Sequence, residues 1–278
     1  MGIFNGCLIT SDVDDTLVSN GYINPKNVEK IEYFISEGGL FSVATGRSAN
    51  AIGTVTAALK RFSPSVVSNG CLIYDYENKK VLHQEKIPQE DHKLIKAVID
   101  AKLKVGCEIH SGYNSYTLLR NSEADFHQKY EGFEAPDSSF EDVDSLDWNK
   151  VIFLTEDVSE FEKIKKIALE CDVSSNLIST GMFSGNARHD FLEVVPNGVS
   201  KATAIGKLCE IFKIDAAKTY AIGDFYNDLP MLKSAAISAA TAGAPDDVKS
   251  VADYITVSCE DGAVADFIDY LTKIHKHK

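Results

Sequence analysis

The sequence predicts an α/β protein in which a Rossmann-like core, built on a parallel sheet, is interrupted by an inserted α+β domain. Three observations support this fold class. Short apolar runs alternate with helical patterns before residue 70 and again after residue 200, as in parallel strands joined by right-handed crossovers. Between these regions the pattern changes to hairpins and antiparallel strands. The 278 residues are enough for one large domain or two moderate ones.

We expect residues 1–83 and 187–278 to form the core, and residues 84–186 to form the inserted domain. The insertion is too long for a crossover connection and too regularly patterned for a disordered loop. Periodicity places such boundaries only to within a few residues. The core is therefore expected to be a domain assembled from two separated segments.

The first core segment opens with an apolar run at residues 7–10, which predicts a buried strand. Asn24 followed by Pro25 predicts a helix that starts with an N-cap and a first-turn proline. Glycines at 38 and 39 end this helix. The further elements expected here are a strand at 40–44, a helix around 52–59, a strand at 65–68 and a hairpin of 72–76 with 81–86.

The inserted domain is predicted from mixed helical and strand patterns. Its expected elements are a helix after Pro88, strands at 105–110 and 115–119, a helix at 125–130, a strand at 151–155, a helix at 160–169, and strands at 173–179 and 190–195. Residues 134–147 are acidic with weak periodicity, and we expect a loop there.

In the second core segment, Ser200 is expected to cap a helix that reaches Phe212. The elements expected after it are a strand at 219–222, a short helix begun by Asn227 or Asp228, a strand at 236–240, a helix at 246–252, a strand at 254–257 and a helix at 262–274. The alternation of strand and helix thus resumes.

The composition limits the classes of partner that the protein is expected to bind. The 28 basic and 41 acidic residues give a net charge of −13, which disfavours nonspecific binding to nucleic acid or anionic membranes. The six cysteines include no CxxC pair, and most lie in apolar stretches, as free buried thiols do. No signal peptide or membrane-spanning run is recognisable. We expect a cytoplasmic protein whose partner is a small molecule, with no nucleic acid, membrane or protein partner.

Asp12 and Asp14 follow the first strand and are separated by one residue, so in extended backbone they project to the same side. Neighbouring carboxylates raise each other's pKa and resist burial unless positive charge is present. A hard divalent cation would supply that charge, because it prefers oxygen ligands. A polar turn that closes the strand is the alternative interpretation.

Four polar groups are predicted at the carboxyl ends of parallel strands, where open α/β sheets bind ligands. They are Asp12 with Asp14, Thr45 with Gly46, Lys201, and the stretch 223–228, which contains Asp224, Asn227 and Asp228. Taken singly, these residues could end strands, cap helices or face solvent. Their shared position indicates one site instead.

The order and spacing of these motifs resemble the haloacid dehalogenase (HAD) superfamily, specifically Cof-type phosphatases with a class IIB cap. Residues 12–16 (Asp-Val-Asp-Asp-Thr) resemble its first motif, and residues 44–47 (Ala-Thr-Gly-Arg) its second. Lys201 resembles the third motif, and residues 223–228 the fourth. The resemblance covers nearly the whole chain, although the inserted domain resembles the cap only in length and placement.

The resemblance implies a Mg²⁺-dependent phosphatase of small phosphorylated metabolites, with sugar phosphates as the expected class, that works through an aspartyl-phosphate. It implies Asp12 as the nucleophile and Asp14 as the acid and base. The implied metal ligands are Asp12, the backbone carbonyl of Asp14, Asp224, and Asp228 as a ligand or beside one; the implied phosphate-binding groups are Thr45, Gly46, Lys201 and Asn227. Mg²⁺ and Lys201 would let a phosphate dianion enter among the carboxylates.

Further residues are candidates for contact with the leaving group. They are Arg47 and Asn69 on the core side, and His110, Tyr113, Asn114, Tyr116, Asn186 and Arg188 in the inserted domain. An ordinary surface or core role is the alternative for each. The sequence also departs from the family: Asp15 stands where Gly is common and is expected to face solvent, and residues 242–244 and Cys259 replace two asparagine positions.

Two other functions fit the same residues. A phosphotransferase or mutase would pass the phosphoryl group to a sugar hydroxyl, because Asp14 could activate either acceptor. A catalytically idle binding or regulatory protein would keep the fold, although it would not need both Asp12 and Asp14. An EF-hand, a Walker A loop and a GxGxxG loop are excluded, because the required residues are missing. A zinc site is excluded, because the seven histidines are scattered without zinc spacing.

Overall fold

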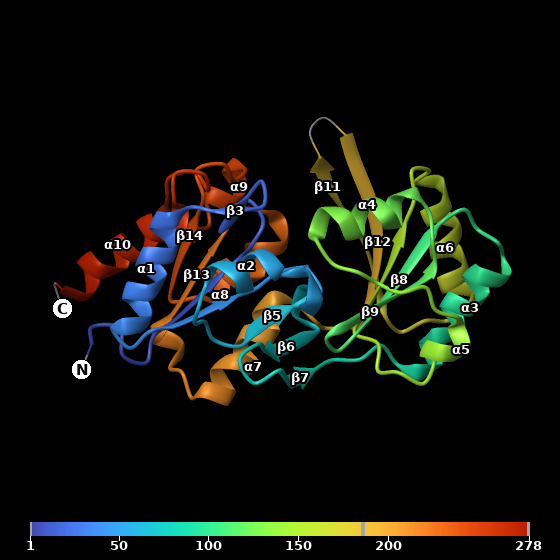
Figure 1. The fold of residues 1–278 in the computed structure, drawn as a ribbon, viewed down its shortest axis with the longest axis horizontal. Helices are drawn as coiled ribbons and strands as arrows, with labels where there is room; N and C mark the ends of the chain where they lie inside the picture. The colour runs from blue at the N-terminus through green and yellow to red at the C-terminus, as the bar shows by residue number, and fades with distance from the viewer. Residues whose placement is uncertain (1, 185–186, 277–278) are drawn as a thin grey trace. The chain divides into compact units, whose positions relative to one another are not determined.

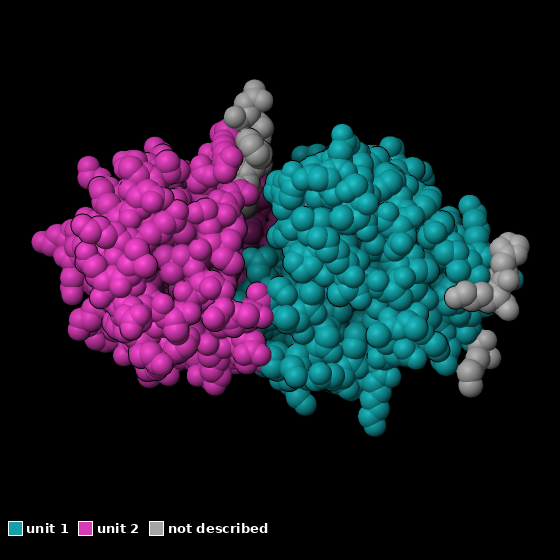
Figure 2. All heavy atoms as spheres, turned by 180° about the vertical axis from the view of Figure 1, so that it is seen from behind, with its two compact units in different colours: residues 1–46, 53–83, 200–278 teal, residues 47–52, 84–199 magenta. Residues whose placement is uncertain are grey.

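The computed structural model describes residues 2–184 and 187–276 (Figure 1). The chain divides into two compact units, coloured separately in Figure 2. Unit 1 comprises Met1–Gly46, Gly53–His83 and Ser200–Lys278, and unit 2 comprises Arg47–Ile52 and Gln84–Val199. Unit 1 is an α/β domain on a parallel sheet and unit 2 is an α+β domain, which confirms the predicted fold class.

Unit 1 is built on a five-stranded parallel sheet with the order β15-β14-β13-β1-β4. These strands are Tyr254–Ile255, Ile237–Ala240, Thr219–Gly223, Leu8–Ser11 and Leu40–Val43, in the same order. β1 pairs with both β13 and β4, and all of its residues are buried. This burial explains the apolar run seen in the sequence, because a parallel sheet covered on both faces needs apolar residues on both sides.

Helices and short turns complete the main body of unit 1. They are α1 (Pro25–Ser36), α2 (Gly53–Ala58), η2 (Ser68–Gly70), α7 (Lys201–Phe212), η4 (Ala216–Lys218), η5 (Tyr226–Asp228), α8 (Leu229–Ser234), α9 (Asp246–Lys249) and α10 (Ala263–Lys276). α1 starts as predicted, since the Asn24 side chain accepts from the Lys26 amide. α1 and α10 lie side by side (Figure 1), joined by an ion pair of Lys30 and Asp269.

Unit 1 also contains two small antiparallel sheets. One is β2 (Val18–Ser19) with β3 (Tyr22–Ile23), and the other is β5 (Ser65–Val67), β6 (Leu72–Asp75) and β7 (Lys80–Gln84). The sequence predicted β5 as a third parallel strand. The structure pairs β5 with β6 in antiparallel fashion, and a single parallel bridge from Ala44 to Val66 connects β5 to the edge of the main sheet, in the direction predicted.

Unit 2 is built on a five-stranded antiparallel sheet with the order β11-β12-β10-β8-β9. The strands are Asn176–Ser184, Ala187–Val195, Lys150–Leu154, Gly106–Ser111 and Asn114–Leu119, in the same order. The helical elements are η1 (Ala49–Ala51), η3 (Gln89–Asp91), α3 (His92–Asp100), α4 (Ser122–Glu131), α5 (Phe140–Val143) and α6 (Ser159–Glu170). The one-turn α5 lies in the expected loop and starts at a Ser139–Asp142 capping box.

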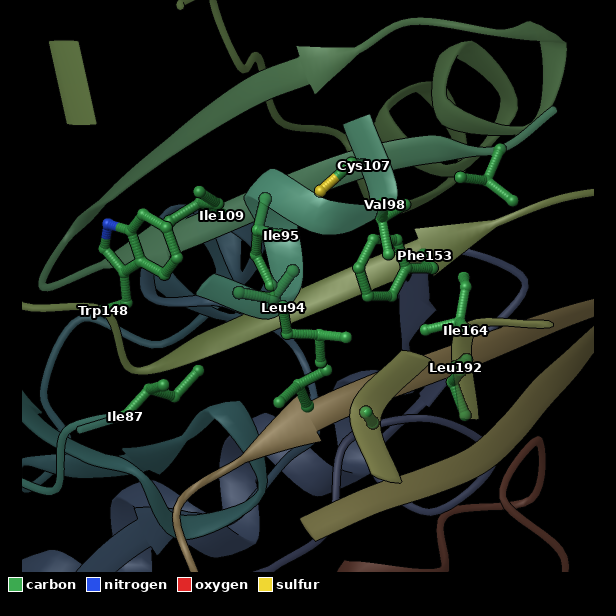
Figure 3. Packing of buried hydrophobic residues seen from close by; sticks show 14 of the residues in the cluster. Ile87, Leu94, Ile95, Val98, Cys107, Ile109, Trp148, Phe153, Ile164 and Leu192 are labelled. Atoms are coloured by element: carbon green, nitrogen blue, oxygen red, sulfur yellow. The ribbon is translucent and has the colours of Figure 1, made fainter. Parts of the chain in front are cut away.

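The apolar core of unit 2 lies between α3, α6 and one face of the sheet (Figure 3). Leu94 and Val98 of α3 meet Cys107 and Ile109 of β8 in this cluster. Because successive residues of a strand point to opposite faces, the residues between and after these two β8 positions project away from the cluster. The far face of the sheet is therefore available for polar side chains.

The unit boundaries differ from the predicted ones in two places. The second core segment was predicted to begin at residue 187, and in the structure it begins at residue 200. Residues 187–195 form β12, which pairs with β11 and β10 of unit 2. Residues 47–52 also belong to unit 2, since Ala51 packs against Phe133 and Ala135. The chain therefore passes between the units four times instead of twice. Among the described residues, no helix has the length and apolar character needed to cross a bilayer.

Candidate active site

Asp12 lies directly after β1, where three parallel strands end side by side. Its amide donates to the Ile222 carbonyl at 2.9 Å, and the Ala44 amide donates to the Ser11 carbonyl at 2.8 Å. These bonds hold the ends of β13, β1 and β4 at one edge of the sheet. The Asp12 side chain is buried at that edge, as the alternation of strands and helices predicts.

Lys201 reaches Asp12 from the first residue of α7. The helix begins at a capping box of Ser200 and Thr203, which fixes where Lys201 leaves the backbone. Gly70, at φ +104°, permits this approach, because a Cβ there would lie 2.2 Å from the Ser200 carbonyl oxygen. The buried Nζ of Lys201 lies 2.5 Å from Asp12 Oδ1 and 2.7 Å from Asp228 Oδ1.

Asp224 and Asp228 are held in the turn after β13. Asp228 is fully buried, and its Oδ2 accepts from the amides of Asp224 at 3.0 Å and Phe225 at 3.3 Å. Gly223 leaves room for this carboxylate, since a Cβ there would lie 2.5 Å from Asp228 Oδ2. The Thr16 hydroxyl donates to Asp224 Oδ1 at 3.0 Å. The turn therefore presents two carboxylates next to Asp12.

The charges of this cluster do not balance. Ligand atoms of Asp12, Asp224 and Asp228 lie within 4.8 Å of one another, beside one ammonium group. Burial raises the pKa of Asp12 well above its usual range, against the opposing effect of Lys201. Burial and the nearby Asp228 raise the pKa of Asp224 to about 7. Burial alone would lower the pKa of Lys201. The negative charges of Asp12 and Asp228 have the larger effect, so the pKa of Lys201 is raised.

The donor set matches the preference of a hard divalent cation. The buried carboxylates of Asp12 and Asp228 and the half-buried carboxylate of Asp224 supply oxygen ligands. Burial and the neighbouring carboxylates raise the pKa values of Asp12 and Asp224, an effect that a bound cation would oppose. Asp12, Asp224 and Asp228 could therefore hold Mg²⁺. Asp14, the fourth expected ligand through its backbone carbonyl, is not one of this side-chain group and is half-buried.

The other core residues predicted for the site form a turn beyond β4. The buried Thr45 donates its amide to the Val66 carbonyl, and the Asn69 amide donates to the Thr45 carbonyl, both at 3.0 Å. A Cβ at Gly46 would lie 3.0 Å from Asn69 Oδ1, so these two residues are in close contact. Asn227 lies in η5 next to Asp228 with an exposed side chain.

Arg47, predicted on the core side, belongs to unit 2. Its Nη1 donates to the carbonyls of Ala51 and Glu131, both at 3.1 Å. The side chain thus stabilises the fold of unit 2, a role that the motif in the sequence did not indicate. This placement corrects the predicted location of Arg47, because its partners lie in the inserted domain.

The candidates from the inserted domain have different environments. His110 is buried, and Tyr116 packs against the apolar cluster. Tyr113, Asn114 and Arg188 are exposed, and the Arg188 Nε donates to Asp190. Asn186 lies outside the described residues. Asp15 is exposed at φ +54°, as expected for its solvent-facing position.

Sequence reasoning missed two sets of residues. Thr16 had been noted only as the last letter of its motif, yet it binds Asp224. The second set is a polar group in unit 2: the buried Glu108, His127, Lys150 and Glu193, with the partly buried Glu131. Charged residues that alternate with apolar ones along residues 105–110 were the available signal, because a buried strand rarely carries charge without partners.

Comparison with known proteins relates this geometry to a family. A model of the haloacid dehalogenase-like hydrolase family matches residues 9–268. The chain is 26% identical to 5-amino-6-(5-phospho-D-ribitylamino)uracil phosphatase YwtE of Bacillus subtilis, over 95% of this chain and 97% of that protein. It is 24% identical to pyridoxal phosphate phosphatase YbhA of Escherichia coli, over 94% of this chain and 97% of that protein.

Solved structures show the same fold. A haloacid dehalogenase-like hydrolase from Bacteroides thetaiotaomicron superposes with a TM-score of 0.82 at 24% identity, covering 95% of this chain and 99% of that one. A protein described as a HAD subclass IIB sugar phosphatase superposes with a TM-score of 0.76 at 24% identity, covering 96% and 99%.

Proposed function

Because the chain belongs to the haloacid dehalogenase-like hydrolase family and is a phosphatase, we propose that it hydrolyses small phosphorylated metabolites with Mg²⁺ through a phosphoryl group on Asp12. The observation that carries this proposal is the cluster of the buried Asp12, Asp228 and Lys201 with the half-buried Asp224. A surplus of buried carboxylates beside one ammonium group is costly unless a cation binds there. The same positive charge then attracts a phosphate dianion.

In the proposed reaction a carboxylate oxygen of Asp12 attacks phosphorus, and the bond from phosphorus to the leaving oxygen breaks. Asp14 donates a proton to the leaving oxygen, which departs as an alcohol. Asp14 then takes a proton from water, whose oxygen attacks the phosphorus of the aspartyl-phosphate. Inorganic phosphate leaves, and Asp12 is regenerated as a carboxylate.

Other groups of unit 1 would bind the phosphoryl oxygens during both steps. Lys201 supplies a full positive charge, and Thr45, the Gly46 amide and Asn227 supply hydrogen-bond donors. Mg²⁺, held by Asp12, Asp224, Asp228 and the carbonyl of Asp14, would neutralise charge on the transferring group. These donors matter most in the transition state, where charge spreads over the equatorial oxygens.

The expected substrate class is small phosphate monoesters, with sugar phosphates first. The names of the relatives support this choice, since they act on a phosphorylated ribitylamino-uracil and on pyridoxal phosphate. A fold neighbour is described as a sugar phosphatase. The acidic chain with six free cysteines is consistent with a cytoplasmic location, which we include in the proposal.

The test is phosphate release from a panel of glucose 6-phosphate, ribose 5-phosphate, pyridoxal 5′-phosphate and phenyl phosphate, with Mg²⁺ or with EDTA. We expect release that requires Mg²⁺ and that falls by at least about 10⁴-fold in Asp12→Asn, because the nucleophile is lost. Asp246→Asn is the control and should stay within about threefold of wild type, since its side chain is fully exposed and lies outside the cluster. Substantial turnover by Asp12→Asn would exclude the mechanism, and transfer to a sugar without phosphate release would indicate a phosphotransferase.

A further inference from the structure

The sheet of unit 2 has two edge strands that differ in how they are covered. The strand order places β11 at one edge and β9 at the other. Along β9, the Thr117 amide donates to the Pro136 carbonyl and the Ser138 amide donates to the Thr117 carbonyl, both at 2.9 Å. An ion pair of Arg120 and Asp137 at 2.7 Å holds the same segment in place. The β9 edge is therefore covered, which prevents further strands from pairing with it.

The outer edge of β11 is not covered in this way. Among residues 2–184 and 187–276, the backbone groups of residues 176–181 have no hydrogen-bond partner outside β12. Alternate residues of a strand direct their N–H and C=O groups away from the neighbouring strand. Every second residue here therefore presents a donor and an acceptor that another strand could bind.

β11 has the length and regularity that extensive pairing requires. It contains nine residues, whereas the other described edge strands contain two to six. Nine residues span about 30 Å at roughly 3.4 Å per residue. The pairing with β12 runs from Asn176 to Ser184 without a shift of register. The strand thus lacks the bulges that commonly disrupt an exposed edge.

β11 also contains no charged residue, although a quarter of the chain is charged. Lysine and proline, which commonly protect an exposed edge, are absent from the strand, and Ile178 is 40% exposed. The net charge of −13 makes two copies of the chain repel each other over most of their surfaces. An uncharged edge is where two copies can approach each other with the least repulsion.

The strand is suited to pairing with a second copy of itself. In an antiparallel pair about a twofold axis normal to the sheet, each residue lies opposite a residue of the same face. Leu177, which packs against the apolar cluster of unit 2, would share one side of the joined sheet with its counterpart, and Ile178 would share the other. Because β11 is uncharged, no register of this pair brings like charges opposite each other.

We propose that the outer edge of β11 pairs in antiparallel fashion with β11 of a second copy of this chain, which joins two five-stranded sheets into one continuous sheet. The unpaired backbone groups supply the hydrogen bonds, and Ile178 supplies apolar contact. The interface lies within unit 2 of each copy and does not depend on the proposed function. Composition predicted no protein partner, and the edge is recognisable only from the strand order, which determines which strand is outermost.

The test is the oligomeric state of the full chain, measured by sedimentation velocity over a range of protein concentrations. We expect a reversible equilibrium of monomer and dimer, as is typical of a small interface. Raising the salt concentration from about 0.05 M to about 0.5 M should strengthen dimerisation severalfold, because salt screens the repulsion between the acidic copies. A protein that stays monomeric at every concentration and salt would overturn the inference and would favour an extended segment of a different protein as the occupant.

The matched variants are Ile178→Lys on the uncovered edge and Asn114→Lys on β9, the covered edge of the same sheet. Both side chains are exposed, so circular dichroism of both variants should match wild type. Ile178→Lys places an ammonium group on the proposed interface in both copies and should raise the dissociation constant of the dimer at least about tenfold. Asn114→Lys should stay within about twofold of wild type. Equal dimerisation of Ile178→Lys and wild type would assign the dimer to another surface and overturn the inference.

A second measurement needs no substitution. Amide hydrogen exchange in residues 176–181 should be slower above the dissociation constant of the dimer than below it, because pairing protects the outward-facing amides. The amides of β10, in the interior of the sheet, are the internal control and should exchange equally at both concentrations. Dimer formation without added protection in β11 would overturn the inference, even if Ile178→Lys failed to fold.

Discussion

The two units each contain a cluster of buried charge, and the clusters differ in how their charge is compensated. In unit 1, carboxylates of Asp12, Asp224 and Asp228 surround the single ammonium of Lys201. In unit 2, the carboxylates of Glu108, Glu131 and Glu193 lie near the cations of His127, Lys150 and Arg47, and the pKa of Glu131 is lowered while that of Asp224 is raised. A cluster with surplus negative charge can hold a cation, whereas a balanced one stabilises the fold.

The largest expected effect comes from removing Lys201, the cation of the unit 1 cluster. Lys201→Met keeps the volume but leaves the carboxylates of Asp12, Asp224 and Asp228 without an ammonium group, so phosphate entry becomes repulsive. We expect kcat/KM to fall about a thousandfold. Lys207→Met, on the exposed side of the same helix, is the control and should stay near wild type, because its pair with Glu210 is on the surface. Comparable activity of the two variants would contradict the role of Lys201.

The corresponding change in unit 2 is His127→Asn, which leaves the buried Glu108 and the partly buried Glu131 without their shared cation. We expect the free energy of unfolding, measured by urea titration, to fall by about 3 kcal/mol or more. Lys165→Met breaks the exposed pair with Glu162 and should cost under about 1 kcal/mol. If the two variants lost the same stability, the network of unit 2 would not be the balanced cluster described above.

Gly223→Ala tests whether activity depends on the exact position of the Asp228 carboxylate in the turn after β13. The added Cβ would lie 2.5 Å from Asp228 Oδ2, so the carboxylate must shift away from the amides that hold it. We expect about a tenfold loss of kcat/KM and a higher Mg²⁺ requirement. Gly206→Ala, in α7 with open space around it, should leave kinetics unchanged and slightly raise stability. Wild-type kinetics in Gly223→Ala would show that Asp228 tolerates displacement.

The smallest expected effect is on the pH dependence of stability, which differs between the two clusters. The pKa of Asp224 is raised to about 7 by burial and by Asp228, so its stability contribution is full below the unfolded pKa near 4 and is lost as pH rises through 7. The contribution of His127, with a folded pKa of about 10, is full below its ordinary pKa of about 6.5 and is lost as pH rises through 10.

For metal-free protein we therefore expect the unfolding temperature to fall between pH 4.5 and 6.5 by about 2 to 4 °C from this source, with Mg²⁺ opposing the fall. Scanning calorimetry in EDTA and in Mg²⁺ is the measurement. Asp224→Asn should flatten the dependence in this range, and an equally steep fall in that variant would assign the effect to other groups.

The sequence predicted the parallel sheet of unit 1 and the residues at its edge because these depend on local patterns. A strand followed directly by Asp12, a helix capped by Ser200 and a turn that follows Gly223 can each be recognised from neighbouring residues. The parallel alternation then brings them together, since parallel strands end at the same edge. Membership of the family follows from the same order of motifs.

The polar group of unit 2 could not be predicted in this way. His127 and Glu108 are 19 residues apart on a helix and a strand, and Lys150 pairs with Glu193 across 43 residues. These pairings depend on the register of an antiparallel sheet, and hydrophobic periodicity specifies which face a residue occupies but not its partner. The predicted boundary at residue 187 differs from the observed one for a related reason, because β12 joins its sheet by long-range pairing with β10.

The four crossings of the chain between the units have a consequence for protein engineering. A chimaera that exchanged only residues 84–199 with a homologue would keep the native residues 47–52. These residues would then contact side chains and carbonyls of the homologue. Arg47 would lose the carbonyl of Glu131, and Asn50 would lose the hydroxyl of Ser115. A graft of unit 2 must therefore carry both segments, so the transplantable module is discontinuous in the gene.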